Sequence, residues 1–289
     1  MQNSVMGVHY KKTCLLLDVD ENFVPSTHRV ITTNHQQLFW SLHDVLDGAI
    51  ALVTNSDRRS IDVETFLPGF PCVSEHGAIF RLDAHGTPDN IAPPFFSEIV
   101  APHIRLDLKK QGVNMTEDST TLRKGHNPAV IVEEKEAGIA IVFGEHECLR
   151  DPIAKIARTI LMHFNDNSAF YVDDSGRDAI EIKASGFAKE KSLDRIMQHP
   201  NFAGRTPIIF GDSVPDRELA KEAFKRYNGY AFFRGDGVEK GLPFEARRLE
   251  TYQDVYDRLK HYLDDFTMQR RFSQQRSQSL SRFHSPTAP

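Results

Sequence analysis

Two aspartates, Asp18 and Asp20, follow an apolar stretch that begins at Thr13. Residues 14–17 are all apolar and are followed by charge, which predicts a buried strand of a parallel sheet. Open α/β sheets bind ligands at the carboxyl ends of their strands, where these two carboxylates emerge. Like charges so close together do not favour stability. They suit a divalent cation, with one carboxylate free to attack an electrophile.

Polar groups also accompany other predicted core elements. They are Thr54 after residues 49–53, Lys189 at the start of a predicted helix, and Asp212 and Asp216 after residues 207–210. The carboxyl ends of parallel strands meet at one edge of a sheet, so we expect these groups to meet Asp18 and Asp20 there. Asp18, Asp212 and a backbone carbonyl would suffice to hold Mg²⁺. The same set of groups could hold a phosphoryl group beside the metal. Lys189 would neutralise negative charge on the phosphoryl oxygens, and Thr54 would donate a hydrogen bond to one of them.

Each of these residues also has a structural interpretation. The first two aspartates could be solvated residues at a strand end, the stretch Thr54-Asn-Ser-Asp57 could be a turn, and Asp216 could cap the following helix. Lys189 is more informative, because a cation at a helix N-terminus opposes the helix dipole and indicates a nearby anion. The evidence is the order and placement of the whole set.

The elements that position these residues alternate between strand and helix at both ends of the chain. Residues 1–81 and 185–267 each show this βα rhythm, which predicts a Rossmann-like parallel sheet with helices on its faces. Residues 82–184 differ, because strands joined by short turns predict an antiparallel sheet backed by helices. We therefore expect an α/β cap domain inserted into an α/β core. The stretch 268–289 is rich in Gln, Ser and Arg and is expected to be disordered.

The composition is that of an ordinary globular protein. Of the 289 residues, 40 % are hydrophobic and 26 % charged, and the net charge of −5 argues against a nucleic-acid binder. The three cysteines are too few and too scattered for a disulfide or zinc framework. Neither a secretion signal nor a stretch of membrane-spanning length is visible, so we expect a cytoplasmic protein without membrane partners.

The motifs resemble those of the haloacid dehalogenase-like phosphatases. That pattern is Asp-x-Asp, a later Thr or Ser, a Lys, and Gly-Asp with a further Asp downstream. Here it is matched by Asp18-Val-Asp20, Thr54, Lys189 and the stretch Gly211-Asp212-Ser-Val-Pro-Asp216. Within this superfamily the chain resembles the trehalose-6-phosphate phosphatases over residues 12–262. The local matches are Glu75-His76-Gly77-Ala78, Lys124-Gly125, Glu181-Ile182-Lys183 and residues 204–212.

The resemblance implies a role for each matched residue. Asp18 would be the nucleophile that forms an aspartyl-phosphate, and Asp20 the general acid and base. Mg²⁺ would bind Asp18, the backbone carbonyl of Asp20, and Asp212, with Asp216 holding the site from behind. The sugar phosphate would be bound by His76, Gly77, Lys124, Glu181 and Lys183. The resemblance thus implies a Mg²⁺-dependent hydrolase that acts on trehalose 6-phosphate in trehalose biosynthesis.

The chain departs from the pattern at three places. Glu21-Asn22 replaces Gly-Thr, Thr54-Asn-Ser-Asp-Arg58 replaces Ser-Gly-Arg, and Ser213 replaces a second acid. Two alternatives therefore stay open. One is a phosphatase for another sugar phosphate, such as sucrose phosphate, mannosyl-3-phosphoglycerate or a hexose phosphate. The other is a catalytically weak protein that binds sugar phosphates.

Overall fold

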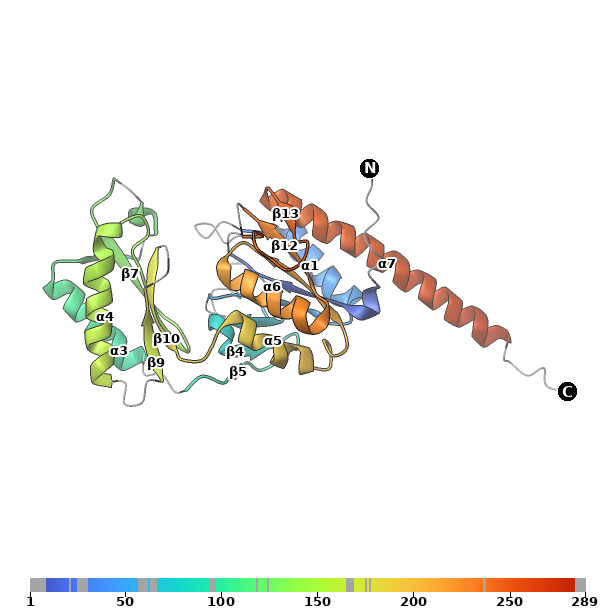
Figure 1. The fold of residues 1–289 in the computed structure, drawn as a ribbon, viewed down its shortest axis with the longest axis horizontal. Coiled ribbons are helices and arrows are strands. Elements are labelled where there is room, and N and C mark those ends of the chain that lie inside the picture. The colour runs from blue at the N-terminus through green and yellow to red at the C-terminus, as the bar shows by residue number, and fades with distance from the viewer. Residues whose placement is uncertain are drawn as a thin grey trace.

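The protein, seen here as a computed structural model, has two α/β units joined side by side (Figure 1). The structure describes residues 9–20, 22–24, 31–56, 62, 67–93, 97–117, 119–123, 125–164, 169–174, 176, 178–235 and 238–283, without the side chains of 119–120 and 277–283. Buried residues form one large hydrophobic cluster in each unit. The inserted unit therefore has a hydrophobic core of its own.

The larger unit, the core, is built on an eight-stranded sheet in the order β13-β12-β11-β1-β2-β3-β4-β5. Its strands are β1 Thr13–Leu17, β2 Ile50–Val53, β3 Cys72–Ser74, β4 Ile79–Arg81, β5 Asp89–Asn90, β11 Thr206–Gly211, β12 Tyr230–Arg234 and β13 Arg247–Leu249. The pairs from β13 to β3 are parallel, and β4 and β5 add antiparallel strands at one edge. The central strands β1 and β2 are buried throughout, as expected for a sheet covered on both faces.

Helices cover both faces of this sheet. They are α1 Thr33–Val45, α5 Lys189–Gln198, α6 Val214–Tyr227 and α7 Tyr252–Phe283. Helices α5 and α6 pack together on one face, and α1 and α7 pack together on the other (Figure 1). The predicted Rossmann-like parallel-sheet core is thereby confirmed.

The smaller unit, the cap, is a five-stranded sheet with two helices behind it. The strands are β6 Asn114–Met115, β7 Ala129–Glu134, β8 Gly138–Val142, β9 Phe170–Asp173 and β10 Ala179–Ala184, in the order β6-β7-β8-β10-β9. The helices are α3 Ser97–Lys110 and α4 Arg150–Phe164, and they lie on the side of the sheet away from the core (Figure 1). The sheet of the cap therefore faces the core.

Two boundaries predicted from the sequence are wrong. Strand β5 pairs with β4, so the first part of the core extends beyond residue 81 to at least Asn90. Such a short polar strand has no hydrophobic pattern by which the sequence could announce it. The tail predicted to be disordered from residue 268 is instead helical to Phe283, because α7 continues without a break. Within the described ranges, every helix is too short or too polar to span a bilayer.

Candidate active site

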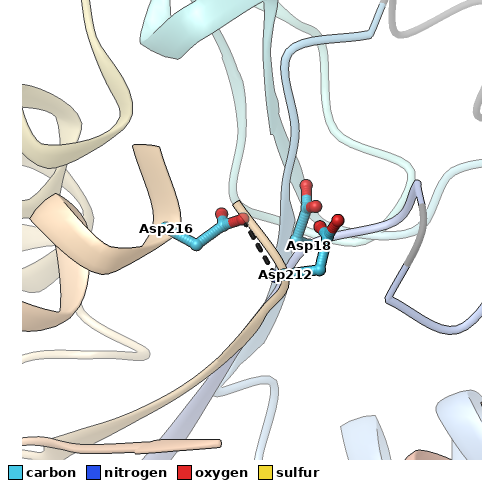
Figure 2. Close-up of side chains that lie close together, drawn as sticks. All are labelled: Asp18, Asp212 and Asp216. Carbon is cyan, nitrogen blue, oxygen red and sulfur yellow. Dashed lines mark hydrogen bonds between the residues drawn. The ribbon is translucent and has the colours of Figure 1, made fainter. Parts of the chain in front are cut away.

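Four charged side chains meet at the carboxyl ends of β1 and β11. Asp18 follows β1, Asp212 follows β11, Asp216 lies in the first turn of α6, and Lys189 is the first residue of α5. In Figure 2 the carboxylates of Asp18 and Asp212 lie side by side, and Asp216 reaches toward them from its helix. The pairing of β1 with β11 aligns Leu17 with Phe210, which brings the residues after both strands together. The predicted meeting of these side chains at one sheet edge is confirmed.

Lys189 is the buried centre of this group. Its Nζ lies 2.6 Å from Oδ1 of Asp18 and 2.7 Å from Oδ1 of Asp216. Burial by itself would lower the pKa of Lys189, but the two carboxylates raise it above its ordinary value. The anion expected beside this helix N-terminus is thus a pair of aspartates. A charged lysine at this position can also neutralise part of a phosphoryl group.

Asp216 organises the loop that carries Asp212. Its Oδ2 accepts hydrogen bonds from the backbone N–H of Asp212 at 3.3 Å and of Ser213 at 3.1 Å, and also from the Ser213 hydroxyl. The close approach depends on Gly211, where a Cβ would lie 2.3 Å from Cβ of Asp216. Asp216 therefore caps α6 and supports the site at the same time, so both interpretations of this residue hold.

The cluster has an excess of negative charge. Burial and the neighbouring Asp216 raise the pKa of Asp18 well above its usual range, while Lys189 opposes the shift. Burial and Asp216 also raise the pKa of Asp212 to about 6, against Asp18, Lys189 and Arg234. Carboxylate oxygens of Asp18, Asp212 and Asp216 lie within 4.8 Å of one another. Hard oxygen ligands with surplus negative charge fit a Mg²⁺ ion.

Asp20, which was predicted to join this group, is near enough to raise the pKa of Asp18, but it is not one of the three carboxylates whose oxygens lie within 4.8 Å of one another. Its Oδ2 accepts a hydrogen bond of 2.6 Å from the hydroxyl of Ser56, in the loop after β2. Ser56 was not among the predicted site residues. Its position two residues after Thr54 is the one signal that could have found it, because the loop after β2 ends at the same sheet edge.

Thr54 is buried at the end of β2. Its backbone N–H donates to the carbonyl of Val73, and its Oγ1 accepts from the backbone N–H of Ser56. Within the described part of the chain, the Thr54 hydroxyl donates to no neighbour, so its proton is available to a ligand.

Asn22 is also buried, and its Nδ2 donates to the carbonyl of Asp18 at 3.0 Å. It thus steadies the chain around Asp18 in place of the threonine of the resembled pattern. Glu21 lies outside the described residues.

Three of the residues predicted to bind substrate, His76, Glu181 and Lys183, lie in a second charged cluster between core and cap. Glu181 of β10 contacts Lys135 through Oε1 at 2.6 Å and His76 through Oε2 at 2.8 Å. Burial would raise the pKa of Glu181, but Lys135 and His76 hold it well below its usual value. Lys183 pairs with Asp173 and lies 4.0 Å from Glu181. Lys124 lies outside the described residues.

The backbone of this junction is also held across the two units. Glu75 is buried and accepts the backbone N–H groups of Glu136 at 2.9 Å and Ala137 at 2.6 Å, in the turn between β7 and β8. The cavity among these residues is about 10 Å³, enough for about one water molecule. Lys135 was missed, and Glu75 was matched without a role, because nothing in the sequence shows which cap turn meets the core.

Gly77 contributes to the fold here rather than to an open pocket. Its φ of +90° is in the region that favours glycine, and a Cβ would lie 2.9 Å from Cβ of Ser192 in α5. This close contact sets the start of α5, and therefore the position of Lys189, against the segment that carries His76.

The chain is similar to phosphatases of known structure. Its sequence matches no family model. It is 24 % identical over 231 residues, 80 % of this chain and 77 % of the relative, to a trehalose-6-phosphate phosphatase of Escherichia coli K12. A haloacid dehalogenase-like hydrolase from Bacteroides thetaiotaomicron superposes with a TM-score of 0.58 at 16 % identity, over 87 % of this chain and all of that one. The fold is that of the haloacid dehalogenase-like hydrolases.

Two further structures share the fold with its cap. A trehalose-6-phosphate phosphatase related protein gives a TM-score of 0.60 at 17 % identity, over 86 % of this chain and 96 % of that one. The C-terminal domain of a Candida albicans trehalose-6-phosphate phosphatase gives 0.60 at 14 % identity, over 90 % and 92 %. Because each covers nearly the whole chain, the likeness includes both the core and the inserted domain.

Proposed function

We propose that this chain is a Mg²⁺-dependent phosphatase that hydrolyses a sugar phosphate, with trehalose 6-phosphate as the first candidate. The observation that carries the proposal is the buried group of Asp18, Lys189, Asp212 and Asp216 at the carboxyl edge of the sheet. The distant relative from E. coli, named as a trehalose-6-phosphate phosphatase, supports the choice of sugar.

Asp18 is the nucleophile in this proposal. Its Oδ1 is held by Lys189, which leaves Oδ2 to attack the phosphorus atom. The new O–P bond forms as the bond from phosphorus to the sugar oxygen breaks, and the electron pair leaves on that oxygen. Water then attacks the phosphorus of the aspartyl-phosphate, which releases phosphate and restores Asp18.

Asp20 is the general acid and base. It gives a proton to the departing sugar oxygen in the first step and takes one from the attacking water in the second. The hydrogen bond from Ser56 fixes one oxygen of Asp20 at this edge of the sheet. Asp20 is near enough to Asp18 to raise its pKa, which is consistent with proton transfer next to the nucleophile.

The other groups hold the phosphoryl oxygens. Lys189 and the Thr54 hydroxyl would contact them directly. Mg²⁺, held by Asp18, Asp212 and the Asp20 carbonyl, would supply positive charge that lets a carboxylate approach a dianion. Asp216 keeps Asp212 and Lys189 in place.

The cap would select the sugar. Glu181 and Lys183 are on alternate residues of β10, so both can reach one ligand, and His76 faces them from the core. The cavity of about 10 Å³ between them has no room for a sugar. We therefore infer that the cap shifts when substrate enters, and that hydroxyl groups of the sugar replace some of the contacts of Glu181.

The test is inorganic phosphate release from trehalose 6-phosphate beside sucrose, glucose and mannose phosphates. Each is assayed with Mg²⁺ and with EDTA, and Asp18→Asn serves as the blank. We expect selective release from trehalose 6-phosphate that needs both Mg²⁺ and Asp18. Selective release from another sugar phosphate would support the phosphatase chemistry but refute trehalose 6-phosphate as the substrate. No release by folded, Mg²⁺-loaded protein, combined with measurable binding of the sugar phosphates, would replace the proposal with a binding protein.

A further inference from the structure

Helix α7 continues well past the body of the core. Its last fully buried side chain among the described residues is Phe266. Farther along, the Gln269 side chain accepts the backbone N–H of Tyr10 at 3.1 Å, and Arg270 donates to the carbonyl of Asp44 at 2.8 Å. Beyond these anchors the helix runs outward to Phe283 (Figure 1). At roughly 1.5 Å per residue, the segment 271–283 is about 20 Å long.

A projecting helix of this kind gains little from its own sequence. Helices of about 12–15 residues are marginal in water, and most helical stability in proteins comes from packing of one face. The segment is rich in Ser and Gln, and Ser competes with the helical backbone for hydrogen bonds. A surface that packs against this segment would stabilise it.

Two large apolar side chains mark the face that such a surface would cover. Met268 is 54 % exposed and Phe272 is 64 % exposed. They are four residues apart, so they lie on the same side of the helix, one turn from each other. This apolar pair is located where the helix leaves the core.

The charges of α7 are divided at the same point. The first half carries the acids Asp254, Asp257, Asp264 and Asp265 against Arg258 and Lys260, and of these acids Asp257 and Asp264 are exposed. From residue 267 to residue 283 the helix carries Arg270, Arg271, Arg276 and Arg282 and no acid; Arg270 is paired with Asp44 and Asp47 of the core, whereas Arg271 is exposed. A helix that is acidic before Met268 and basic after it is complementary to a second copy of itself only in antiparallel orientation.

We propose that this face of α7 is the interface with a second copy of the chain. The two helices cross antiparallel near Met268, with Phe272 of each copy beside Met268 of the other. The basic half of each helix then lies along the acidic half of its partner, which brings Arg271 close to Asp264 across the interface. A two-fold axis relates the two copies, so every contact between them occurs twice.

An anionic lipid surface is the other partner that a basic helix can attract. It would leave the exposed acids Asp257 and Asp264 without a cationic partner, whereas the basic half of a second copy would lie along them. The second copy is therefore the occupant that the charge distribution favours.

Sedimentation velocity of the full chain over a wide range of concentration tests the proposal. We expect the mass to rise from 32.8 kDa toward twice that value. Phe272→Glu should weaken association at least about tenfold, because it places charge in the centre of the contact. Met162→Glu is the matched control, since Met162 is 83 % exposed on α4 of the cap. Circular dichroism verifies that both variants fold.

A charge exchange tests the antiparallel register. Arg271→Asp and Asp264→Arg should each weaken association, and the double variant should recover at least part of it. A single 32.8 kDa species at every concentration would overturn the proposal. So would equal behaviour of Phe272→Glu and Met162→Glu, or no recovery in the double variant. Binding of a monomeric protein to phosphatidylserine vesicles, lost in Phe272→Glu, would assign the face to lipid instead.

Discussion

The two charged clusters of this molecule are built on opposite electrostatic principles. At the core edge, three carboxylates lie close together and two of them contact Lys189, and burial with mutual repulsion raises the pKa values of Asp18 and Asp212. At the cap junction, Glu181 lies between Lys135 and His76, and its pKa is lowered. The first cluster lacks positive charge and can take a cation, whereas the second is already neutralised from within. The core edge is therefore suited to phosphoryl chemistry and the junction to a contact that opens for a ligand.

The largest expected effect comes from Asp18→Asn. The amide removes the nucleophile, so phosphate release should fall by at least about 10⁴-fold, as for other lost nucleophiles. Folding should survive, because Lys189 keeps its contact with Asp216. Steady-state kinetics measures the loss of phosphate release, and thermal unfolding measures whether the variant still folds. Near-normal turnover in this variant would remove the core cluster from the chemistry.

Lys189→Met should cost the most stability. It leaves Asp18 and Asp216 buried without their cation, and breaking a buried ion pair typically costs about 3–5 kcal/mol of unfolding free energy. Urea unfolding in EDTA measures the loss. Adding Asp18→Asn removes one of the uncompensated charges, so the double variant should be more stable than Lys189→Met alone. Additive losses would contradict the coupling between these side chains.

Mg²⁺ should stabilise the core through Asp212. An ion at about 100 times its dissociation constant adds about 2.7 kcal/mol to the unfolding free energy. Asp212→Asn should lose this gain in thermal unfolding with Mg²⁺.

In EDTA the same variant should be more stable than wild type above pH 6, because the raised pKa of about 6 means that ionised Asp212 opposes folding. The stability advantage of the variant should shrink as pH falls through 6. A larger advantage at lower pH would refute the claim that ionised Asp212 destabilises the folded protein.

Glu181→Gln should give the smallest and most selective effect. Loss of one charged contact to the sugar predicts a decrease in kcat/KM of roughly 10–100-fold for the preferred sugar phosphate. Turnover of a small aryl phosphate, which does not need the cap, should change little. Glu147→Gln is the control, because Glu147 is exposed elsewhere on the cap. Equal losses for both substrates would mean that Glu181 is structural and does not choose the sugar.

The core site could be predicted from the sequence because its residues lie at strand ends. Asp18 and Asp212 follow buried apolar runs, and parallel pairing of β1 with β11 then brings them together. Lys189 and Asp216 are helix-terminal residues, whose positions follow from the same βα order. Local pattern and topology were sufficient for all four.

The junction could not be predicted in the same way. Lys135 contacts Glu181, and Glu75 accepts the backbone N–H of Ala137, because the turn between β7 and β8 is placed against the core. That placement depends on the packing of two domains. Strand β5 is too short to show a hydrophobic period, and the continuation of α7 to Phe283 opposes its Ser- and Gln-rich composition. Each miss concerns a contact or an element that local propensity does not determine.

The most direct test of the central claim is to trap the phosphoenzyme. Acid quenching during turnover of trehalose 6-phosphate, followed by peptide mapping, should locate phosphate on Asp18, and none should appear in Asp18→Asn. Phosphate on another residue, or phosphate release by Asp18→Asn at the wild-type rate, would contradict a mechanism in which Asp18 is the nucleophile.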